Sequence, residues 1–111
     1  MSDGAEGCRF GLKESTIEKI NSVFARYREI EKVVLYGSRA KGTFRHGSDI
    51  DLTIIGEALT YPQLQRIERE IDALLLPYKI DLSLYRQIDN QDLRDHIERV
   101  GVVFYTEIGK P

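Results

Sequence analysis

The chain contains a single cysteine, Cys8, and no large surplus of either charge. One cysteine excludes a disulfide within the chain, so the fold does not depend on an oxidising compartment. Lys and Arg number 16, Asp and Glu number 18, and the net charge is −2. General binding of DNA or RNA needs a surplus of basic residues, so this composition argues against it. Any basic patch must therefore be local and bind something small.

Long apolar runs are also missing. No segment approaches the length of about 18 apolar residues that a membrane-spanning helix needs, and the N-terminus lacks the basic-then-apolar order of a signal peptide. We therefore expect a cytoplasmic protein that does not enter a membrane. The 111 residues, 41% hydrophobic and 31% charged, are typical of a single globular domain, 1–111. Residues 1–11 are mostly polar, and we expect them to be flexible.

Apolar residues at steps of three and four predict three helices. Capping signals mark where these helices begin: Ser15 with Glu18, Thr60 with Gln63, and Asn90. Stop signals follow the second and third helices at Pro77 and Gly101.

Short segments with apolar alternation or β-branched residues predict strands. They are Lys32–Tyr36, Asp49–Ile55, Lys79–Tyr85 and, as a last short strand or an extended tail, Val102–Tyr105. Helices alternate with these strands, which predicts an α/β fold with a small mixed sheet flanked by helices. The first two strands follow each other so directly that an antiparallel or mixed sheet is favoured over a purely parallel one.

Two aspartates stand at alternate positions where the second strand begins. Side chains on a strand alternate between its faces, so Asp49 and Asp51 point the same way, about 7 Å apart. At an effective dielectric constant of about 20, two such carboxylates repel each other by about 2 kcal/mol. A bound Mg²⁺ ion would remove this repulsion, because Mg²⁺ prefers oxygen ligands and accepts one or two carboxylates. An acid pair that only caps or solvates a strand is the alternative.

Asp81 favours the metal site over that alternative. It lies in the middle of the third strand, in "KIDLSLY", although aspartate is disfavoured in strands. If the second and third strands are neighbours in register, Asp81 completes a cluster of three carboxylates that could hold two cations.

A glycine-rich turn follows the first strand. Ser38 to Lys41 can form one helical turn between Gly37 and Gly42, and backbone N–H groups at such a start bind phosphate. Gly37 lets the backbone come close to a ligand, and the Ser38 hydroxyl adds a donor. Arg39, Lys41 and Arg45 supply the local positive charge that a triphosphate needs.

Two other interpretations of the turn were weighed. A Walker A motif requires Lys followed by Ser or Thr after its second glycine, whereas Gly42 is followed by Thr43 and Phe44, so that motif is excluded. An ordinary glycine-rich turn stays open if the segment is taken alone. Taken with the acids, the turn would lie beside a metal site, an arrangement that suits in-line attack on a nucleoside triphosphate.

The spacing of these residues resembles the signature of the DNA polymerase β-like nucleotidyltransferase superfamily. Gly37-Ser38, ten further residues, Asp49-x-Asp51 and the later Asp81 carry the resemblance, which extends from about Val33 to Leu84. In length and layout the chain looks like the minimal nucleotidyltransferases of bacteria and archaea.

This resemblance implies a role for each motif residue. Asp49 and Asp51 would bind the catalytic Mg²⁺ ions, of which two are expected, with Mn²⁺ as an alternative metal. Asp81 would bind the second ion and activate the attacking hydroxyl, while Gly37 and Ser38 would hold the terminal phosphates. The implied reaction moves a nucleoside monophosphate, with AMP from ATP favoured, to a hydroxyl acceptor and releases pyrophosphate.

The resemblance also implies a helical partner protein of the HEPN or substrate-binding type, acting with this chain as two halves of a complex or as toxin and antitoxin. In the toxin case AMP goes to a tyrosine of the partner. An antitoxin-like module that neutralises its partner by contact alone is the alternative function, and the three clustered acids favour the enzyme. A small-molecule modifier such as an antibiotic adenylyltransferase is disfavoured, because the chain has no room for an acceptor domain.

Two histidines and two tyrosines are further candidates for the site. His46 is expected to be a solvated loop residue, with a phosphate contact as the weaker alternative. His96 is expected on the surface of the last helix. Tyr36 is expected to pack in the core, and Tyr85 is equally suited to packing or to a contact with a nucleotide base.

Overall fold

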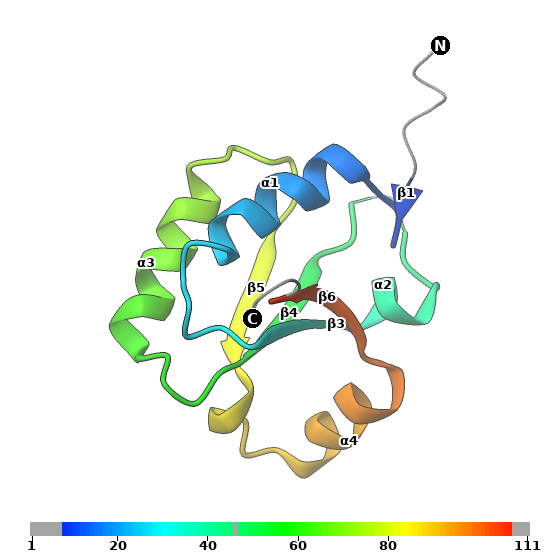
Figure 1. The fold of residues 1–111 in the computed structure, drawn as a ribbon. Coiled ribbons are helices and arrows are strands. Elements are labelled where there is room, and N and C mark those ends of the chain that lie inside the picture. Colours follow the sequence, from blue (N-terminus) through cyan, green and yellow to red (C-terminus); the bar gives the residue numbers. More distant parts are fainter. Residues whose placement is uncertain (1–7, 46, 108–111) are drawn as a thin grey trace.

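In the computed structural model, which describes residues 8–45 and 47–107, strands and helices alternate around one central sheet (Figure 1). Four strands of the described chain form this sheet in the order β5-β4-β3-β6. The strands are β3 (Lys32–Tyr36), β4 (Ile50–Ile55), β5 (Ile80–Leu84) and β6 (Val102–Thr106). The helices are α1 (Glu14–Phe24), α2 (Ser38–Lys41), α3 (Tyr61–Asp72) and α4 (Gln91–Val100), with a short 3₁₀ turn at Tyr85–Gln87.

The sheet is mixed, as the order of the elements predicted. Strand β3 runs antiparallel to both β4 and β6, whereas β4 and β5 run parallel. Helices α1 and α3 lie side by side on one face of the sheet, and α4 lies on the other (Figure 1). The buried residues Ile50, Leu52 and Ile54 belong to the core beneath α1 and α3. Side-chain alternation therefore turns the intervening Asp51 toward the face that carries α4.

All three helices begin close to the predicted starts, and two of the three predicted caps are confirmed. The Thr60 hydroxyl accepts a hydrogen bond from the Gln63 N–H at 3.3 Å, and Gln63 Oε1 accepts one from the Thr60 N–H at 2.9 Å, which completes a capping box. The Asn90 side chain accepts a hydrogen bond from the Leu93 N–H at 3.0 Å and caps α4.

The predicted capping box at Ser15 is wrong. Helix α1 begins at Glu14, and its N-cap residue, Lys13, makes no side-chain capping bond. Lys13 is paired with Cys8 in a small hairpin, so the helix follows directly from a strand, and Ser15 lies inside the first turn.

The predicted stop at Pro77 is also wrong. Helix α3 ends at Asp72, where the chain turns through Leu75 in the left-handed conformation, with φ of 56°. The Leu75 N–H donates to the Asp72 carbonyl in this turn, so the helix has ended before it reaches the proline. Gly101 does cap α4, but in an extended rather than a left-handed conformation.

The segment before α1 forms a hairpin where flexible chain was expected for residues 1–11. Strands β1 (Cys8–Arg9) and β2 (Leu12–Lys13) pair antiparallel across a turn at Phe10 and Gly11, both with positive φ, and residues 1–7 lie outside the described residues. Leu12 is fully buried and Phe10 packs against the core. Apolar burial therefore holds the hairpin on the domain.

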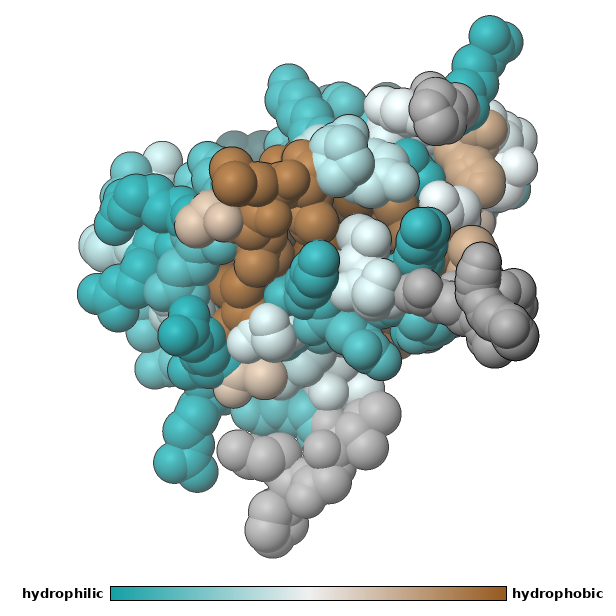
Figure 2. Space-filling view, turned by 90° about the horizontal axis from the view of Figure 1, so that it is seen from above, coloured by the Kyte–Doolittle hydropathy of each residue, from teal (hydrophilic) through white to brown (hydrophobic). Residues whose placement is uncertain are grey.

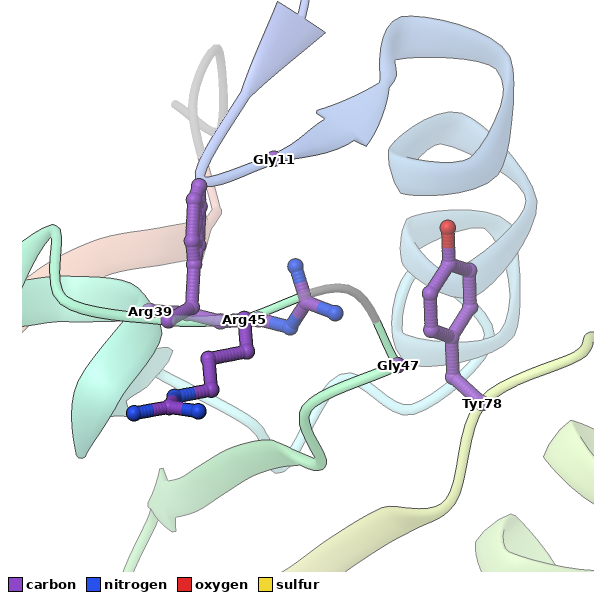
Figure 3. Close-up of a pocket in the computed structure, with 6 residues that line it drawn as sticks. Gly11, Arg39, Arg45, Gly47 and Tyr78 are labelled. Atoms are coloured by element: carbon purple, nitrogen blue, oxygen red, sulfur yellow. The ribbon is translucent and has the colours of Figure 1, made fainter.

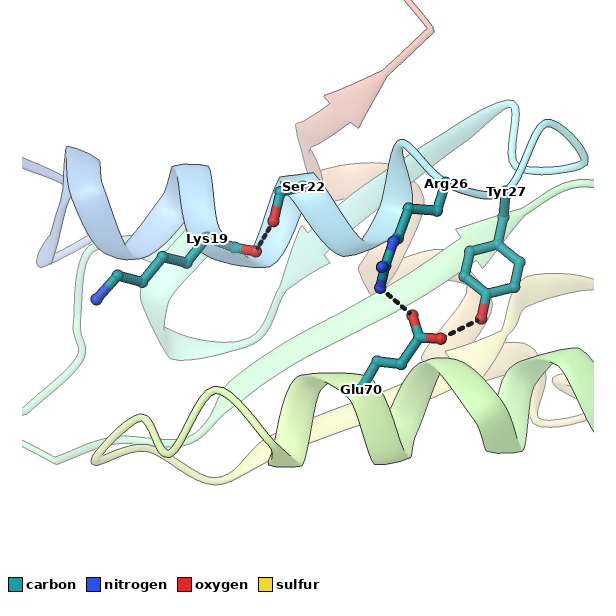
Figure 4. A network of polar contacts seen from close by, with 5 residues as sticks. All are labelled: Lys19, Ser22, Arg26, Tyr27 and Glu70. Atoms are coloured by element: carbon teal, nitrogen blue, oxygen red, sulfur yellow. Dashed lines mark hydrogen bonds and ion pairs between the residues drawn. The ribbon is translucent and has the colours of Figure 1, made fainter.

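The segment that follows α1 is joined to α3 by polar contacts (Figure 4). The Glu70 carboxylate on α3 accepts a hydrogen bond from the Tyr27 hydroxyl at 3.0 Å and pairs with Arg26 at 3.3 Å. Burial, together with Glu70, raises the pKa of Tyr27. These contacts therefore attach the segment after α1 to α3.

The surface seen from the α1 side is largely hydrophilic, with an apolar area near its centre (Figure 2). Among the described residues, Tyr61, Leu75 and Val103 are the large apolar side chains that are exposed. None of the helices in the described ranges is both long enough and apolar enough to cross a membrane.

Candidate active site

Two of the predicted acids lie directly beside each other on neighbouring strands. Asp51 of β4 and Asp81 of β5 are register partners in the parallel pair, so both side chains are on the α4 face of the sheet. Asp49 immediately precedes β4, which begins at Ile50, one residue later than predicted. Asp51 is half-buried, whereas Asp49 and Asp81 are exposed. The second and third predicted strands are therefore neighbours in register, which was the condition for bringing Asp81 to the other acids.

The electrostatics at Asp51 are those of a carboxylate among like charges. Burial raises the pKa of Asp51, and the negative charges of Asp81 and Asp49 raise it further, while His96 acts in the opposite direction. None of the three aspartates forms an ion pair or a side-chain hydrogen bond within residues 8–45 and 47–107. The three carboxylates are thus available to a ligand that carries positive charge.

The donor set fits a hard divalent cation such as Mg²⁺. Carboxylate oxygens are the ligands that Mg²⁺ prefers, and it usually takes one or two carboxylates together with water and substrate phosphates. Within the described part of the chain, no three His, Cys, Asp or Glu side chains are placed to hold a metal ion by themselves. The described residues therefore do not form the predicted three-carboxylate cluster as a complete metal site, and an ion here would need water or phosphate oxygens as further ligands.

Gly37 brings the glycine-rich turn against the acids. Tyr36, the last residue of β3, is the register partner of Asp51, so the residue after it lies next to that carboxylate. Gly37 has φ of 80° and ψ of −158°, a conformation that is essentially restricted to glycine. A β-carbon at this position would collide with Oδ2 of Asp51 and lie 3.3 Å from its Cγ. Only glycine therefore permits this contact between the turn and the acid.

The turn after Gly37 is the predicted single helical turn, Ser38–Lys41, followed by Gly42 in the left-handed conformation. Ser38 is half-buried, and its hydroxyl has no partner among the described residues. Lys41 is exposed, and its ammonium group likewise forms no ion pair in the described ranges. Both groups are free to contact a phosphate.

Arg39 was predicted to supply local positive charge to a ligand, but the structure buries its side chain among protein groups. It is only 4% exposed. Its guanidinium donates to the Ser48 carbonyl at 2.8 Å and to the Phe10 carbonyl at 2.8 Å. The rings of Phe44 and Tyr78 flank it at 5.2 and 5.1 Å. Arg39 thus ties α2 to the hairpin and to the loop before β4, and we leave it out of the proposed phosphate contacts.

A cavity of about 200 Å³ opens beside Arg39 (Figure 3). It is lined by Gly11, Arg39, Phe44, Arg45, Gly47 and Tyr78. No carboxylate lines it, and the guanidinium of Arg39 is already bonded to backbone carbonyls. We therefore place the candidate site at the acids and not in this cavity.

His96 belongs to the site, although a surface position was predicted for it. It is half-buried, and its Nε2 accepts a hydrogen bond from the backbone N–H of Gly37 at 3.1 Å. Its ring meets that of Tyr36 edge-on, with the centroids 6.2 Å apart. One signal was present in the sequence, because His96 lies three positions after the apolar Leu93 and so shares its side of the helix. His46 lies outside the described residues.

The two tyrosines next to the motifs both lie on this side of the sheet. Tyr36 is half-buried, and its pKa is raised by burial and by Asp51 and Asp81, against a hydrogen bond with Ser83 that lowers it. Tyr85 donates its hydroxyl to Glu98 at 2.7 Å, and the guanidinium of Arg94 lies 4.6 Å from the centre of its ring. Packing against α4 thus accounts for the position of Tyr85.

Comparisons with known proteins cover most of the chain. The sequence model of a family described as "Polymerase beta, Nucleotidyltransferase" matches residues 18–108. Two proteins of Methanocaldococcus jannaschii, each named "Putative protein adenylyltransferase", are similar in sequence. The first is 42% identical over 41 residues, which cover 36% of this chain and 41% of that protein. The second is 30% identical over 77 residues, which cover 67% of this chain and 78% of that protein.

Solved structures share the fold. One described as a "putative minimal nucleotidyltransferase" is 27% identical, with a TM-score of 0.62 over 80% of this chain and 89% of that one. Another, described as the tri-AMPylated HEPN toxin of Shewanella oneidensis in complex with the MNT antitoxin, contains a chain that is 16% identical. Its TM-score is 0.62 over 84% of this chain and 71% of that one, a likeness that shows the fold alone.

Proposed function

Since this chain belongs to the polymerase β nucleotidyltransferase family, we propose that it transfers AMP from ATP to a hydroxyl group and releases pyrophosphate. One observation carries the proposal: the Gly37 backbone lies directly against the Asp51 carboxylate. The Ser38 hydroxyl, which can donate a hydrogen bond to a phosphate, therefore lies beside the face of the sheet that carries the unpaired carboxylates. The family relatives named as adenylyltransferases favour ATP over other nucleotides.

The acids have separate roles in the proposed reaction. Members of this family typically use divalent metal ions, and Mg²⁺ held by Asp49, Asp51 and Asp81 would supply positive charge to the triphosphate. Asp81 is exposed at the edge strand β5, where an acceptor can approach, and it accepts the proton of the acceptor hydroxyl. The acceptor oxygen forms a bond to the α-phosphorus, and the bond from that phosphorus to the bridging oxygen breaks, so pyrophosphate leaves. Ser38 and Lys41 hold the leaving phosphates.

The acceptor in this proposal is a helical HEPN-type partner protein. The solved toxin–antitoxin complex with the similar fold contains an AMPylated HEPN toxin, which supports this class of acceptor. The described residues form a four-stranded sheet with its helices and a small hairpin, and no separate acceptor-binding domain. A partner that covers the α4 side of the sheet would therefore complete the site with its own hydroxyl group.

A labelled-nucleotide assay tests the function. The chain is incubated with Mg²⁺ and a purified HEPN-type protein from the same genome, and with ATP labelled at either the α- or the γ-phosphate. We expect the α-label to appear on the partner and the γ-label to appear in pyrophosphate. Asp51→Asn should abolish transfer, whereas Asp72→Asn, a change to an exposed aspartate at the end of α3, should not.

Two results would count against the enzyme. Transfer of the γ-label would mean a different reaction, and absence of any label on the partner would remove the support for transfer. If, in addition, Asp51→Asn neutralised the partner as well as the wild-type chain does, contact alone would be the function.

A further inference from the structure

The hydrogen bond between His96 and Gly37 joins two distant parts of the chain at the candidate site. His96 lies on α4, 59 residues beyond Gly37, and its Nε2 accepts the Gly37 N–H at 3.1 Å. An unprotonated imidazole nitrogen can accept such a hydrogen bond. Gly37 is also the residue at which a β-carbon would collide with the Asp51 carboxylate. The imidazole thus holds the peptide that separates β3 from the phosphate turn.

A second contact fixes the orientation of the His96 ring. The ring meets Tyr36 edge-on, with an angle of 81° between the planes, which is a favourable geometry for aromatic pairs. Tyr36 is itself the register partner of Asp51. His96 therefore contacts both residues that precede Ser38. Tyr36 lies beside Asp51 in the sheet, and Gly37 leaves no space for a β-carbon next to the Asp51 carboxylate.

We propose that His96 is a positioning residue for nucleotide binding, an inference that rests on the proposed function and deepens it. His96 accepts a hydrogen bond from the Gly37 N–H and so holds Gly37 in its observed conformation. This conformation keeps the Ser38 hydroxyl next to the Asp51 carboxylate, so that both can contact one nucleotide. The bond also occupies the Gly37 N–H, so the contacts of the turn with phosphate begin at Ser38. Helix α4 thereby becomes part of the nucleotide site although it carries none of the motif residues.

Two substitutions separate the hydrogen bond from the ring contact. His96→Phe keeps an aromatic ring against Tyr36 but has no acceptor atom. His96→Gln loses the ring but places Oε1 the same number of bonds from Cβ as Nε2 of histidine, so it can still accept the Gly37 N–H. Arg99→Gln, a change to an exposed residue of the same helix, serves as the matched control.

The readout is the Kd for ATP in the presence of Mg²⁺, measured by titration calorimetry, beside the melting temperature in EDTA. We expect His96→Phe to weaken ATP binding by about five- to tenfold, the scale of one hydrogen bond. His96→Gln should stay within about twofold of the wild type, and Arg99→Gln should be unchanged. A merely structural residue would instead lower the melting temperature of both His96 variants and leave the Kd of the folded protein unchanged.

The outcomes separate this inference from the proposed function. If the wild-type chain binds Mg²⁺ and ATP but His96→Phe binds them equally well, the positioning role alone is overturned. If the wild-type chain binds no ATP, the proposed function falls and the inference falls with it. Should His96→Phe fail to fold, amide hydrogen exchange at Gly37 decides: slow exchange in the wild type and in His96→Gln supports the bond, and fast exchange in both overturns it.

Discussion

At the scale of single residues, the site depends on how closely a backbone can approach a carboxylate. Gly37 has a conformation that is essentially restricted to glycine, and a β-carbon at this position would collide with the Asp51 carboxylate. Gly42, at the other end of the same turn, also has positive φ but has no neighbouring atom within 4 Å of where a β-carbon would stand. Substitution of Gly42 therefore tests backbone strain alone, whereas substitution of Gly37 tests backbone strain together with a collision with Asp51.

We expect Gly37→Ala and Gly42→Ala to differ in function more than in stability. Gly42→Ala should cost about 1–2 kcal/mol of folding free energy, because alanine is strained in the left-handed conformation, and should keep its affinity for ATP. Gly37→Ala should cost about 1–3 kcal/mol and also lose ATP binding, because its methyl group displaces Asp51. Urea unfolding and calorimetric titration measure the two effects. Equal ATP affinity in both variants would show that the contact with Asp51 is unimportant.

The raised pKa of Asp51 predicts a pH-dependent stability in the absence of metal. Because folding raises this pKa above the ordinary value of 3.8, folding favours the protonated carboxyl. The contribution of Asp51 to stability is therefore fully present below pH of about 3.8 and is lost as the pH rises through the folded-state pKa.

Substitution of Asp51 by asparagine should remove this pH dependence. In EDTA at pH 7, we expect Asp51→Asn to be more stable than the wild type by at most about 1 kcal/mol, since solvent screens a partly exposed group. The difference should shrink as the pH falls toward 4. Urea unfolding at both pH values measures it, with Asp72→Asn as the control. A wild-type chain that is as stable as Asp51→Asn at pH 7 would contradict the crowding of negative charge.

At the scale of elements, Arg39 ties the glycine-rich turn to two other segments of the chain. It bonds to the hairpin at Phe10 and to the loop before β4 at Ser48, and it lies on α2. Arg39→Met would leave two carbonyl groups without their donor. We expect a loss of about 2–3 kcal/mol in the free energy of unfolding. The exposed Arg45→Met should change it by less than about 0.5 kcal/mol.

Nucleotide affinity distinguishes the two roles of Arg39. If Arg39→Met kept the stability of the ligand-free protein but lost ATP binding, the phosphate contact predicted from the sequence would be correct, and the structural role would be wrong. Both quantities come from urea unfolding and titration calorimetry of the same variant.

Local sequence patterns predicted the elements that depend on local interactions. The strand Lys32–Tyr36 has its predicted bounds, and the Thr60 and Asn90 caps form as expected, because each requires only residues a few positions apart. The capping box at Ser15 failed because pairing of Lys13 with Cys8 sets the start of α1. The hairpin itself was not predicted, since burial of Leu12 in the core depends on the completed fold.

The residues of the candidate site likewise include some that local sequence spacing predicted and some that it did not. The spacing of Gly37, Ser38, Asp49 and Asp51 is local and was visible in the sequence, and with Asp81 it indicated the family that the comparisons confirm. The partners of Arg39 and His96 were not visible. Phe10 lies 29 residues from Arg39, and Gly37 lies 59 residues from His96. Such contacts exist only once the sheet and its helices are packed.

At the scale of the whole molecule, the sheet order joins the two halves of the site. Strands β5, β4 and β3 are neighbours, so Asp81, Asp51 and the Gly37 turn that follows β3 come together from three segments of the chain. Helices α1 and α3 cover the other face, and their core holds these strands in place. The central claim is that the turn and the acids form one Mg²⁺-dependent nucleotide site.

Titration calorimetry with ATP tests this claim most directly. The wild-type chain is titrated in Mg²⁺ and again in EDTA, and Asp51→Asn is titrated in Mg²⁺. We predict measurable binding only for the wild type in Mg²⁺, because the acids need the cation and the cation needs the phosphates. Equal affinity of the wild type with and without Mg²⁺, or wild-type affinity in Asp51→Asn, would contradict the claim that these residues form one site.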